Sequence, residues 1–234
     1  MAGAGSRFEK AGYTFPKPLI EVDGKPMIQA VVENIDLVGE ARHIFIVQEE
    51  HYDRYALKYL LPLIAGEDTE IVKVNGLTEG AACTTLLAKA LINNDEPLLL
   101  ANSDQIIRWK KGQAPFDHLF DQTEGLIYTF QATHPKWSFA RTTAHNQVLE
   151  VAEKRPISHT ATCGVYRWRR GRDYVKYAEQ MIEKQIRTNG EFYVCPVYNE
   201  AIEDGMRVTA VDVDGMWGIG TPEDLETYLV TLRS

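Results

Sequence analysis

The chain has 234 residues, of which 44% are hydrophobic and 25% are charged, and its formal net charge is −8 at pH 7. This composition is typical of a soluble globular protein with a core of good size. The negative charge disfavours nucleic acid or an anionic membrane as a partner, and the sequence shows neither a membrane-spanning apolar run nor a signal peptide. Three cysteines without metal-ligand spacing favour reduced thiols and a cytoplasmic location.

The chain opens on a glycine-rich loop, Ala2-Gly3-Ala4-Gly5-Ser6-Arg7. Its two glycines leave room for backbone N–H groups to surround phosphate oxygens. Lys17 follows ten residues after Arg7, between two prolines that hold the backbone extended and aim the side chain. Arg7 and Lys17 are therefore candidates to neutralise a triphosphate. A Gly-x-Gly pattern alone is weak evidence, because tight turns also carry glycines.

Helices and strands alternate after the loop. Met27, Val31, Ile35 and Val38 share one face of an expected helix. The expected elements are helices over 27–38, 52–64 and 80–92, and strands over 44–47, 69–74 and 97–101. The strand over 97–101 is a continuous apolar run, typical of a strand covered on both faces. This alternation predicts an α/β fold with a Rossmann-like, mostly parallel mixed sheet flanked by helices.

The pattern changes after residue 124. We expect strands over 125–133, 138–143, 148–152, 161–168 and 207–213, and a helix over 174–187. Thr221 and Pro222 start a last helix, as its N-cap and first residue. We expect a single domain over 1–234, with a nucleotide-binding half (1–124) and a small α+β acceptor-binding half (125–234). Because a buried strand normally precedes a phosphate-binding glycine loop, we also expect residues upstream of Met1.

A candidate metal ligand follows the apolar strand, in Asn102-Ser103-Asp104-Gln105. Open α/β sheets bind ligands at the carboxyl ends of their parallel strands. Asp104 is thus a candidate Mg²⁺ ligand, because Mg²⁺ takes one or two carboxylates together with phosphate oxygens. An aspartate that caps a turn is an equal alternative from position alone.

The glycine loop, Phe15-Pro16-Lys17-Pro18-Leu19 and Gly24-Lys25-Pro26-Met27-Ile28 together resemble the signature of the sugar-phosphate nucleotidyltransferases, or nucleoside-diphosphate-sugar pyrophosphorylases. The resemblance extends over nearly the whole chain. It implies a Mg²⁺-dependent enzyme that joins a nucleoside triphosphate to a sugar-1-phosphate and releases pyrophosphate. It further implies catalytic roles for Arg7 and Lys17, metal binding by Asp104, and nucleotide binding by Ala2, Gly3, Ala4, Gly5, Ser6, Glu79, Gly80 and Ser103. Glu79 is alternatively a simple acid at a helix start.

The acceptor side carries two further points of resemblance. Glu153-Lys154-Arg155-Pro156 resembles the family's second signature, which implies that Lys154 contacts the acceptor phosphate and Glu153 its hydroxyls. Gly164 would let the sugar lie against the backbone, and Glu191 matches the family's sugar-hydroxyl glutamate. Without the resemblance, Glu-Lys on a loop is a solvated pair, and Asn189-Gly190 favours a hairpin turn.

The third signature departs from the family pattern. Trp217-Gly218-Ile219-Gly220-Thr221-Pro222 has glycine at position 218, where many members have an aspartate that is the second metal ligand. Asp214 or Asp212, just upstream, are candidate replacements, and we assign Asp214. Asp104 with the substrate phosphates alone is the other arrangement.

Other functions stay open. One alternative is a cytidylyltransferase acting on a non-sugar phosphate such as phosphocholine. A choline-type cation would need an aromatic cage, for which the candidates are Trp137, Phe139, Tyr166, Trp168, Phe192, Tyr193 and Trp217. A glycosyltransferase of similar fold usually carries Asp-x-Asp, and Asn102-Ser103-Asp104 lacks the first acid. Gly218 also permits a non-catalytic nucleotide-sugar-binding protein. The resemblance implies a role in polysaccharide biosynthesis and leaves assembly into a homo-oligomer open.

Overall fold

The computed structural model describes residues 1–3, 5–35, 41–111 and 123–233. The chain forms two compact units. The first comprises Met1–Leu77, Ser103–Ile107 and Met216–Ser234, and the second comprises Thr78–Asn102 and Arg108–Gly215. Each unit is therefore built from segments that are distant in sequence. The division at residue 124 concerns ligand binding and does not coincide with these units.

Helix α2 (Met27–Ile35) organises the core of the first unit. Met27 and Val31 pack in one apolar cluster with Phe8 from the N-terminal segment, and Ile35 packs against it, as the sequence periodicity predicts. The adjacent face of α2 packs in a second cluster with strand β3 (Ile44–Gln48) and helix α4 (Leu57–Ala65). Strand β3 pairs in parallel with β4 (Glu70–Val74) along its whole length.

The first unit also contains helix α9 (Pro222–Leu232) and several short elements. The short elements are α1 (Ser6–Lys10), the 3₁₀ helix η1 (Lys17–Leu19), β1 (Glu21–Val22), β2 (Lys25–Pro26) and α3 (Glu49–Arg54). The single helix expected over 52–64 is wrong, because Ala56 adopts a left-handed backbone (φ +50°) that separates α3 from α4. The predicted start of α9 is confirmed, since the Thr221 hydroxyl accepts a hydrogen bond from the N–H of Asp224 (3.2 Å). Val38 lies outside the described residues.

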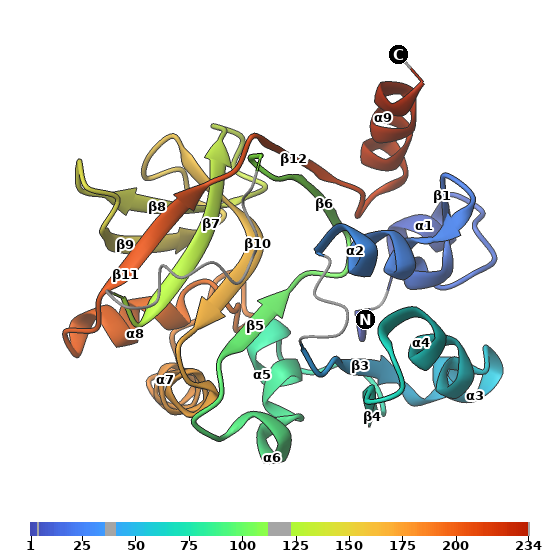
Figure 1. Ribbon diagram of the computed structural model, residues 1–234, viewed down its shortest axis with the longest axis horizontal. Helices are drawn as coiled ribbons and strands as arrows, with labels where there is room; N and C mark the ends of the chain where they lie inside the picture. Colours follow the sequence, from blue (N-terminus) through green and yellow to red (C-terminus); the bar gives the residue numbers. More distant parts are fainter. Residues whose placement is uncertain (4, 36–40, 112–122, 234) are drawn as a thin grey trace. The chain divides into compact units, whose positions relative to one another are not determined.

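A mixed sheet forms the centre of the second unit, in the order β11-β7-β10-β8-β9, with β5 also paired to β10 (Figure 1). The strands are β5 (Leu98–Ala101), β7 (Gly125–Gln131), β8 (Ser138–Thr142), β9 (Val148–Glu153), β10 (Thr160–Trp168) and β11 (Val208–Asp212). The pair β7–β11 is parallel, whereas β10 runs antiparallel to β5, β7 and β8. The α/β class with mixed sheets is confirmed. Strand β5, expected to be covered on both faces, is only half-buried.

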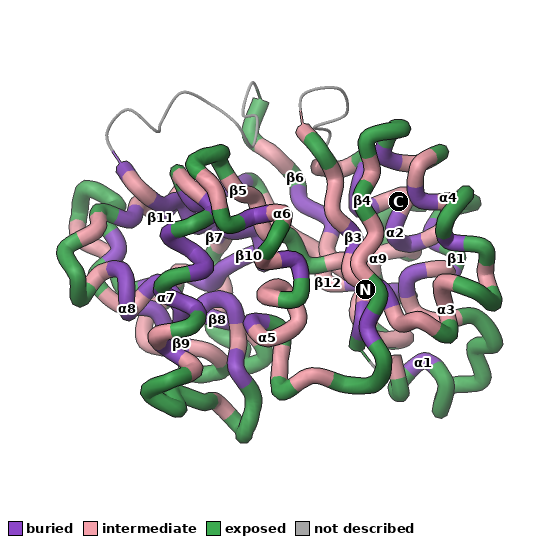
Figure 2. The backbone as a smooth tube through the Cα atoms, turned by 90° about the horizontal axis from the view of Figure 1, so that it is seen from below, coloured by how far each residue is buried: buried purple, intermediate pink, exposed green. Residues whose placement is uncertain are grey.

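The helices of the second unit are α5 (Ala81–Leu86), α6 (Lys89–Ile92), α7 (Gly171–Glu183) and α8 (Val197–Glu203). The helix expected over 80–92 is thus two helices. Helix α7 packs on α8 and β10, where the indole of Trp168 stacks on the ring of Tyr198 with centroids 4.3 Å apart. Gly125 makes room for this ring, because an added Cβ would lie 2.8 Å from Tyr198. Most residues of β7 and β10 are buried (Figure 2).

Two further strands, β6 (Gln105–Arg108) and β12 (Gly215–Gly218), pair with each other, and each includes a point where the chain passes from one unit to the other. Within the described residues, no helix combines the length and the apolar character needed to cross a membrane.

Candidate functional site

Two residues that the sequence assigns to phosphate and to metal are direct partners in the first unit. Pro16 has extended backbone (φ −62°, ψ 149°), and Lys17 begins η1 directly after it. The Lys17 ammonium donates a hydrogen bond to Oδ2 of Asp104, and both side chains are 25% exposed. Because both groups are partly shielded from water, their attraction is stronger than that of a fully exposed ion pair.

Two glycines lie beside this contact, and one of them, Gly220, leaves space for it. A Cβ atom added at Gly220 would lie 2.5 Å from Asp104 Oδ2 and 3.3 Å from Lys17 Nζ. Gly5 has a φ of +61°, which favours glycine, and an added Cβ there would lie 3.5 Å from Lys17 Cβ. The N–H of Ile219 donates to the Asp104 carbonyl at 2.8 Å and holds the two segments together. Gly5, Lys17, Asp104 and Gly220, here called the Lys17 cluster, thus join four sequence motifs.

The glycine loop is held by Gln48, a residue that the sequence analysis did not single out. Gln48 is the last residue of β3, and its Nε2 donates to the carbonyls of Ala2 (2.5 Å) and Gly76 (3.0 Å). Gly76 follows β4, which ends beside β3 because the two strands are parallel. An amide side chain at the carboxyl end of a buried strand is the sequence signal that points to such a residue.

The other predicted nucleotide-binding residues of the first unit lie near the same loop in sequence. Arg7 is exposed on α1, and within the described residues its guanidinium makes no hydrogen bond or ion pair. Gly3 and Ser6 are also exposed, whereas Ser103 is half-buried. Ala4 lies outside the described residues. The structure therefore brings Lys17, and not Arg7, into contact with Asp104.

Asp104 has the chemistry that a Mg²⁺ ligand requires. Carboxylate oxygens are the hard ligands that Mg²⁺ prefers, and one or two carboxylates suffice when phosphate oxygens and water complete the shell. Gly220 leaves space beside Oδ2 that a Cβ would fill. Asp214 belongs to the second unit, where its backbone exchanges two hydrogen bonds with Arg108. Among the described residues, no group of three histidine, cysteine or acidic side chains is arranged to hold a metal, so Asp214 stays a prediction.

In the second unit, the Glu-Lys motif begins at the last residue of β9. Glu153 ends this strand, and the hydroxyl of Ser138, at the paired start of β8, donates to its carboxylate. Burial raises the pKa of Glu153 above its usual range, and the hydrogen bond from Ser138 offsets only part of that rise. Glu153 is thus an inward-placed carboxyl at the strand end, where the resemblance expects the acceptor hydroxyls.

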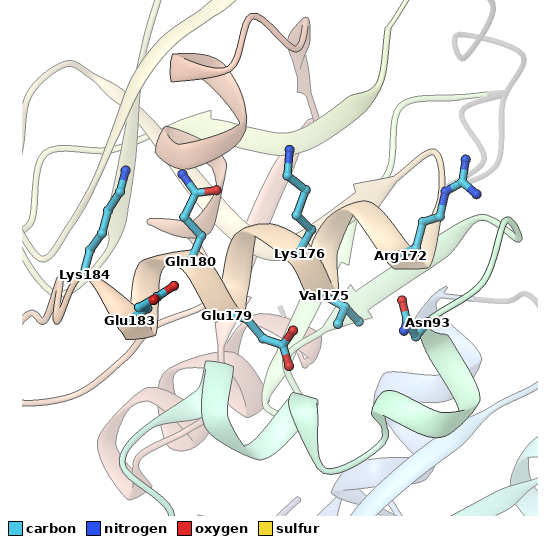
Figure 3. A pocket seen from close by; sticks show the side chains of 8 residues that line it. All are labelled: Asn93, Arg172, Val175, Lys176, Glu179, Gln180, Glu183 and Lys184. Carbon is cyan, nitrogen blue, oxygen red and sulfur yellow. The ribbon is translucent and has the colours of Figure 1, made fainter.

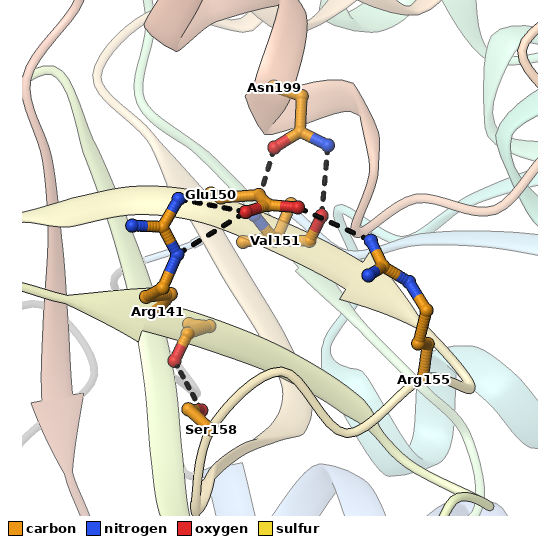
Figure 4. Close-up of polar contacts among 7 residues, drawn as sticks. Arg141, Glu150, Val151, Arg155, Ser158 and Asn199 are labelled. Atoms are coloured by element: carbon orange, nitrogen blue, oxygen red, sulfur yellow. Dashed lines mark hydrogen bonds and ion pairs between the residues drawn. The ribbon is translucent and has the colours of Figure 1, made fainter.

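Polar contacts fix the strand and loop around this motif (Figure 4). Glu150 of β9 accepts hydrogen bonds from Arg141 of β8 at 2.9 Å and from Arg155 at 3.3 Å. Asn199 of α8 pairs its side-chain amide with both backbone groups of Val151, each at 2.9 Å. Because these contacts hold the chain on both sides of Lys154, the loop presents this lysine in a defined position.

Lys154 and Glu191 meet through Tyr193. The Lys154 ammonium donates to the Tyr193 hydroxyl, which in turn donates to the Glu191 carboxylate. The ammonium also lies 4.4 Å from the centroid of the Tyr193 ring, in a cation–π contact. Glu153, Lys154, Glu191 and Tyr193 are here called the Lys154 cluster. It contains three predicted acceptor-binding residues and one, Tyr193, that entered the sequence analysis only as an aromatic candidate.

The segment predicted to contact the base is joined to the Lys154 cluster through the backbone. The N–H of Phe192 donates to the carbonyl of Glu79 at 2.8 Å. Gly80 has a φ of +132°, and an added Cβ would lie 2.4 Å from the Phe192 carbonyl oxygen, so only glycine fits. The Glu79 carboxylate pairs with Arg187 at 2.6 Å. Glu79 therefore has a structural partner, and a base contact stays a prediction.

Gly164 is placed where β10 changes register against β7, between Thr162 and Tyr166. It is buried, its φ is +71°, and its carbonyl accepts a hydrogen bond from the N–H of Asn102 at 2.9 Å. A left-handed glycine at a register shift is typical of a β-bulge. This bulge is reason enough for glycine at position 164, and the sugar contact stays a prediction.

A family model described as "Nucleotidyl transferase" matches residues 1–233. The chain belongs to the nucleotidyl transferase family. The family expected from the sequence motifs is therefore confirmed.

Known relatives are similar over nearly all of this nucleotidyl transferase. It is 26% identical to the low-salt glycan biosynthesis nucleotidyltransferase Agl11 of Haloferax volcanii over 95% of the chain, and 25% identical to a mannose-1-phosphate guanylyltransferase catalytic subunit beta of Drosophila melanogaster over 100% of the chain. The chain spans only 62% of the length of each of these two relatives.

Solved structures share the fold. A nucleoside-diphosphate-sugar pyrophosphorylase from Vibrio cholerae superposes with a TM-score of 0.86 at 26% identity, covering 98% of both chains. An inositol-1-phosphate CTP transferase from T. maritima superposes with a TM-score of 0.75 at 18% identity, covering 99% of this chain and 91% of that one.

The aromatic side chains proposed for a choline cage do not form one in this nucleotidyl transferase. Phe139, Tyr166, Trp168 and Phe192 are buried. The rings of Trp137 and Tyr193 each already face a lysine ammonium, at 4.6 and 4.4 Å. The Trp217 ring packs against Tyr228 in the first unit. A cage needs several exposed aromatic faces around one cation, so these residues argue against phosphocholine.

A groove of about 790 Å³ lies elsewhere in the second unit, along α7 (Figure 3). The cations in its lining are already paired with acidic side chains. The pairs are Arg172–Asp95, Lys176–Asp204 and Lys184–Glu200. The groove contains none of the predicted site residues and is not part of the candidate site.

Proposed function

We propose that this chain is a Mg²⁺-dependent nucleotidyltransferase that joins a nucleoside triphosphate to a sugar-1-phosphate, giving a nucleotide-sugar and pyrophosphate. The Lys17 cluster is the observation that carries the proposal, because it joins a lysine, a carboxylate and two glycines from four motifs. The family membership supports the same reaction class. A cytoplasmic role in nucleotide-sugar supply for polysaccharide synthesis is part of the proposal.

The reaction needs positioning and charge neutralisation more than acid–base chemistry. The attacking group is a phosphate oxygen that is already an anion, and it displaces pyrophosphate from the α-phosphorus in line. Lys17 would stabilise the charge that develops at the α-phosphate, and Arg7 with the Gly3–Gly5 backbone would hold the outer phosphates. Asp104 would hold Mg²⁺, which supplies further charge neutralisation when bound. Lys154 would hold the acceptor phosphate.

Pyrophosphate release by the purified chain with Mg²⁺ tests the proposal. Each of CTP, UTP, dTTP, GTP and ATP is paired with a panel of sugar-1-phosphates, with phosphocholine and with inositol-1-phosphate. Release that requires one nucleotide and one sugar-1-phosphate supports the proposal. Release only with phosphocholine or inositol-1-phosphate would replace the acceptor class. Nucleotide binding without release from any pair would favour a non-catalytic binding protein.

Lys17→Ala is the variant that links the activity to the site. We expect kcat to fall about 100-fold or more, because one preorganised charge at the reacting phosphate is lost, while the acceptor KM changes little. Lys73→Ala is the matched control, since Lys73 is exposed and paired with Glu49 at 2.9 Å. Equal losses in kcat and acceptor binding would contradict the assignment of Lys17 to the transition state.

A further inference from the structure

Tyr193 bridges a cation and a carboxylate through its hydroxyl. Its hydroxyl accepts from the Lys154 ammonium and donates to Glu191, so it stands between the two charges. Within the described residues, Lys154 makes no direct ion pair with any carboxylate. A lysine held by a neutral hydroxyl and a ring face keeps its full charge for another partner.

A second lysine in the same unit shows the alternative arrangement. Lys176 lies 4.3 Å from the centroid of the Tyr177 ring, and its ammonium donates to the Tyr177 hydroxyl at 3.2 Å. This ammonium also reaches Asp204 directly, at 2.9 Å. Lys176 is therefore neutralised by its carboxylate, whereas Lys154 is not.

The position of Tyr193 is fixed by its neighbours along the chain. Phe192 is buried, its N–H donates to Glu79, and its carbonyl accepts from the N–H of Ala82 at 3.0 Å. On the other side of the contact, Lys154 has a left-handed backbone (φ +53°), and its N–H donates to the carbonyl of Trp137 at 3.1 Å. Both partners thus stand on anchored backbone, and the hydroxyl is held at the point where it intervenes.

We infer that Tyr193 is a positioning residue that keeps the Lys154 ammonium apart from Glu191 and available to a phosphate monoester of the acceptor. This inference rests on the proposed function and deepens it. Without the hydroxyl, the Lys154 ammonium forms a direct ion pair with the Glu191 carboxylate, and this pair neutralises its charge. Binding of the acceptor phosphate weakens, while nucleotide binding and the chemical step do not depend on this contact.

Tyr193→Phe tests the inference, since it keeps the ring and removes only the hydroxyl. We expect the acceptor KM to rise about tenfold, as for one charge-assisted hydrogen bond, with kcat and the nucleotide KM changed less than about threefold. Tyr177→Phe is the matched control and leaves all three constants unchanged. Equal acceptor KM in Tyr193→Phe and the unaltered chain overturns the inference.

The double variant Tyr193→Phe/Glu191→Gln distinguishes positioning from a structural role. With the Glu191 carboxylate neutralised, the direct ion pair between Lys154 and Glu191 cannot form, so the affinity for inorganic phosphate recovers part of the loss. A merely structural role for Tyr193 predicts that the second substitution adds to the first. Additive loss therefore overturns the inference, and recovery supports it.

Titration of inorganic phosphate into the full chain, followed by calorimetry, gives a readout that needs no turnover. We expect the phosphate Kd to rise about tenfold in Tyr193→Phe and to stay unchanged in Tyr177→Phe. Unchanged phosphate binding in Tyr193→Phe counts against the positioning role. Pyrophosphate release that is absent from every substrate pair, together with the expected phosphate results, counts against the proposed function alone.

Discussion

Gly220→Ala tests whether the Lys17 cluster works only when nothing fills the space beside Asp104. The new Cβ would lie 2.5 Å from Oδ2 and 3.2 Å from Cγ of Asp104. Contacts below about 3.0 Å are essentially absent between real Cβ atoms and their neighbours, so one group must shift by about 0.5 Å. The carboxylate has little freedom to move, because Oδ2 accepts a hydrogen bond from the Lys17 ammonium and the Asp104 carbonyl accepts one from the N–H of Ile219.

The size of the effect follows from this overlap. Overpacking of this kind costs about 1–3 kcal/mol. If that cost falls on the arrangement of Lys17 and Asp104 in the reacting complex, kcat falls about 5-fold to 150-fold. The acceptor KM is expected to stay within about threefold, since the acceptor contacts are assigned to the Lys154 cluster.

Steady-state pyrophosphate release, with a thermal melt of each variant, is the assay. Gly215→Ala is the matched control from strand β12, because its added Cβ meets Arg108 at 3.7 Å, an ordinary contact distance. We expect Gly215→Ala to retain its kcat. A folded Gly220→Ala variant with unchanged kcat would refute the reasoning, because Asp104 and Lys17 would then tolerate displacement without loss of chemistry.

Two further predictions concern stability. At pH 8, Glu153→Gln is expected to raise the melting temperature and to weaken acceptor binding. The folded-state pKa of Glu153 is raised above its unfolded value, so ionised Glu153 lowers the stability of the protein once the pH exceeds the unfolded pKa. The gain in melting temperature should therefore vanish near pH 4, where the carboxyl is largely protonated in both states. An equal gain at both pH values would contradict the burial argument. Thr221→Ala should lower the free energy of unfolding by about 1 kcal/mol through loss of the N-cap of α9, whereas Thr227→Ala on the same helix should change it by less than about 0.5 kcal/mol in urea titrations.

The sequence predicts those site residues whose local context carries a signal. Lys17 is flanked by prolines, and Asp104 follows an apolar strand, so both are recognisable without a structure. Tyr193 and Gln48 are not, because their roles depend on side-chain atoms meeting across 39 and 46 positions. Gly220 belongs to a recognised motif, yet its function as empty space beside a carboxylate appears only in three dimensions.

The errors in secondary structure have equally local causes. The helix expected over 52–64 is interrupted at Ala56, whose left-handed backbone has no signal in an alanine side chain. The strand over 97–101 reads as fully covered because it is apolar throughout, but β5 is half-buried in the described structure. Hydrophobic periodicity therefore predicts the kind of element well and its breaks and exposure poorly.

The two clusters differ in how their lysine is paired, and the difference bears on the substrate that each is proposed to bind. In the Lys17 cluster the ammonium is already paired with Asp104, so the pair carries no net charge. A triphosphate at such a pair needs an additional cation, which agrees with the proposal that Asp104 holds Mg²⁺ there. In the Lys154 cluster the ammonium contacts a neutral hydroxyl instead of a carboxylate, which agrees with the proposal that Lys154 holds the acceptor phosphate directly. This difference in pairing is consistent with the nucleotide and acceptor roles that the family resemblance implies for the two clusters.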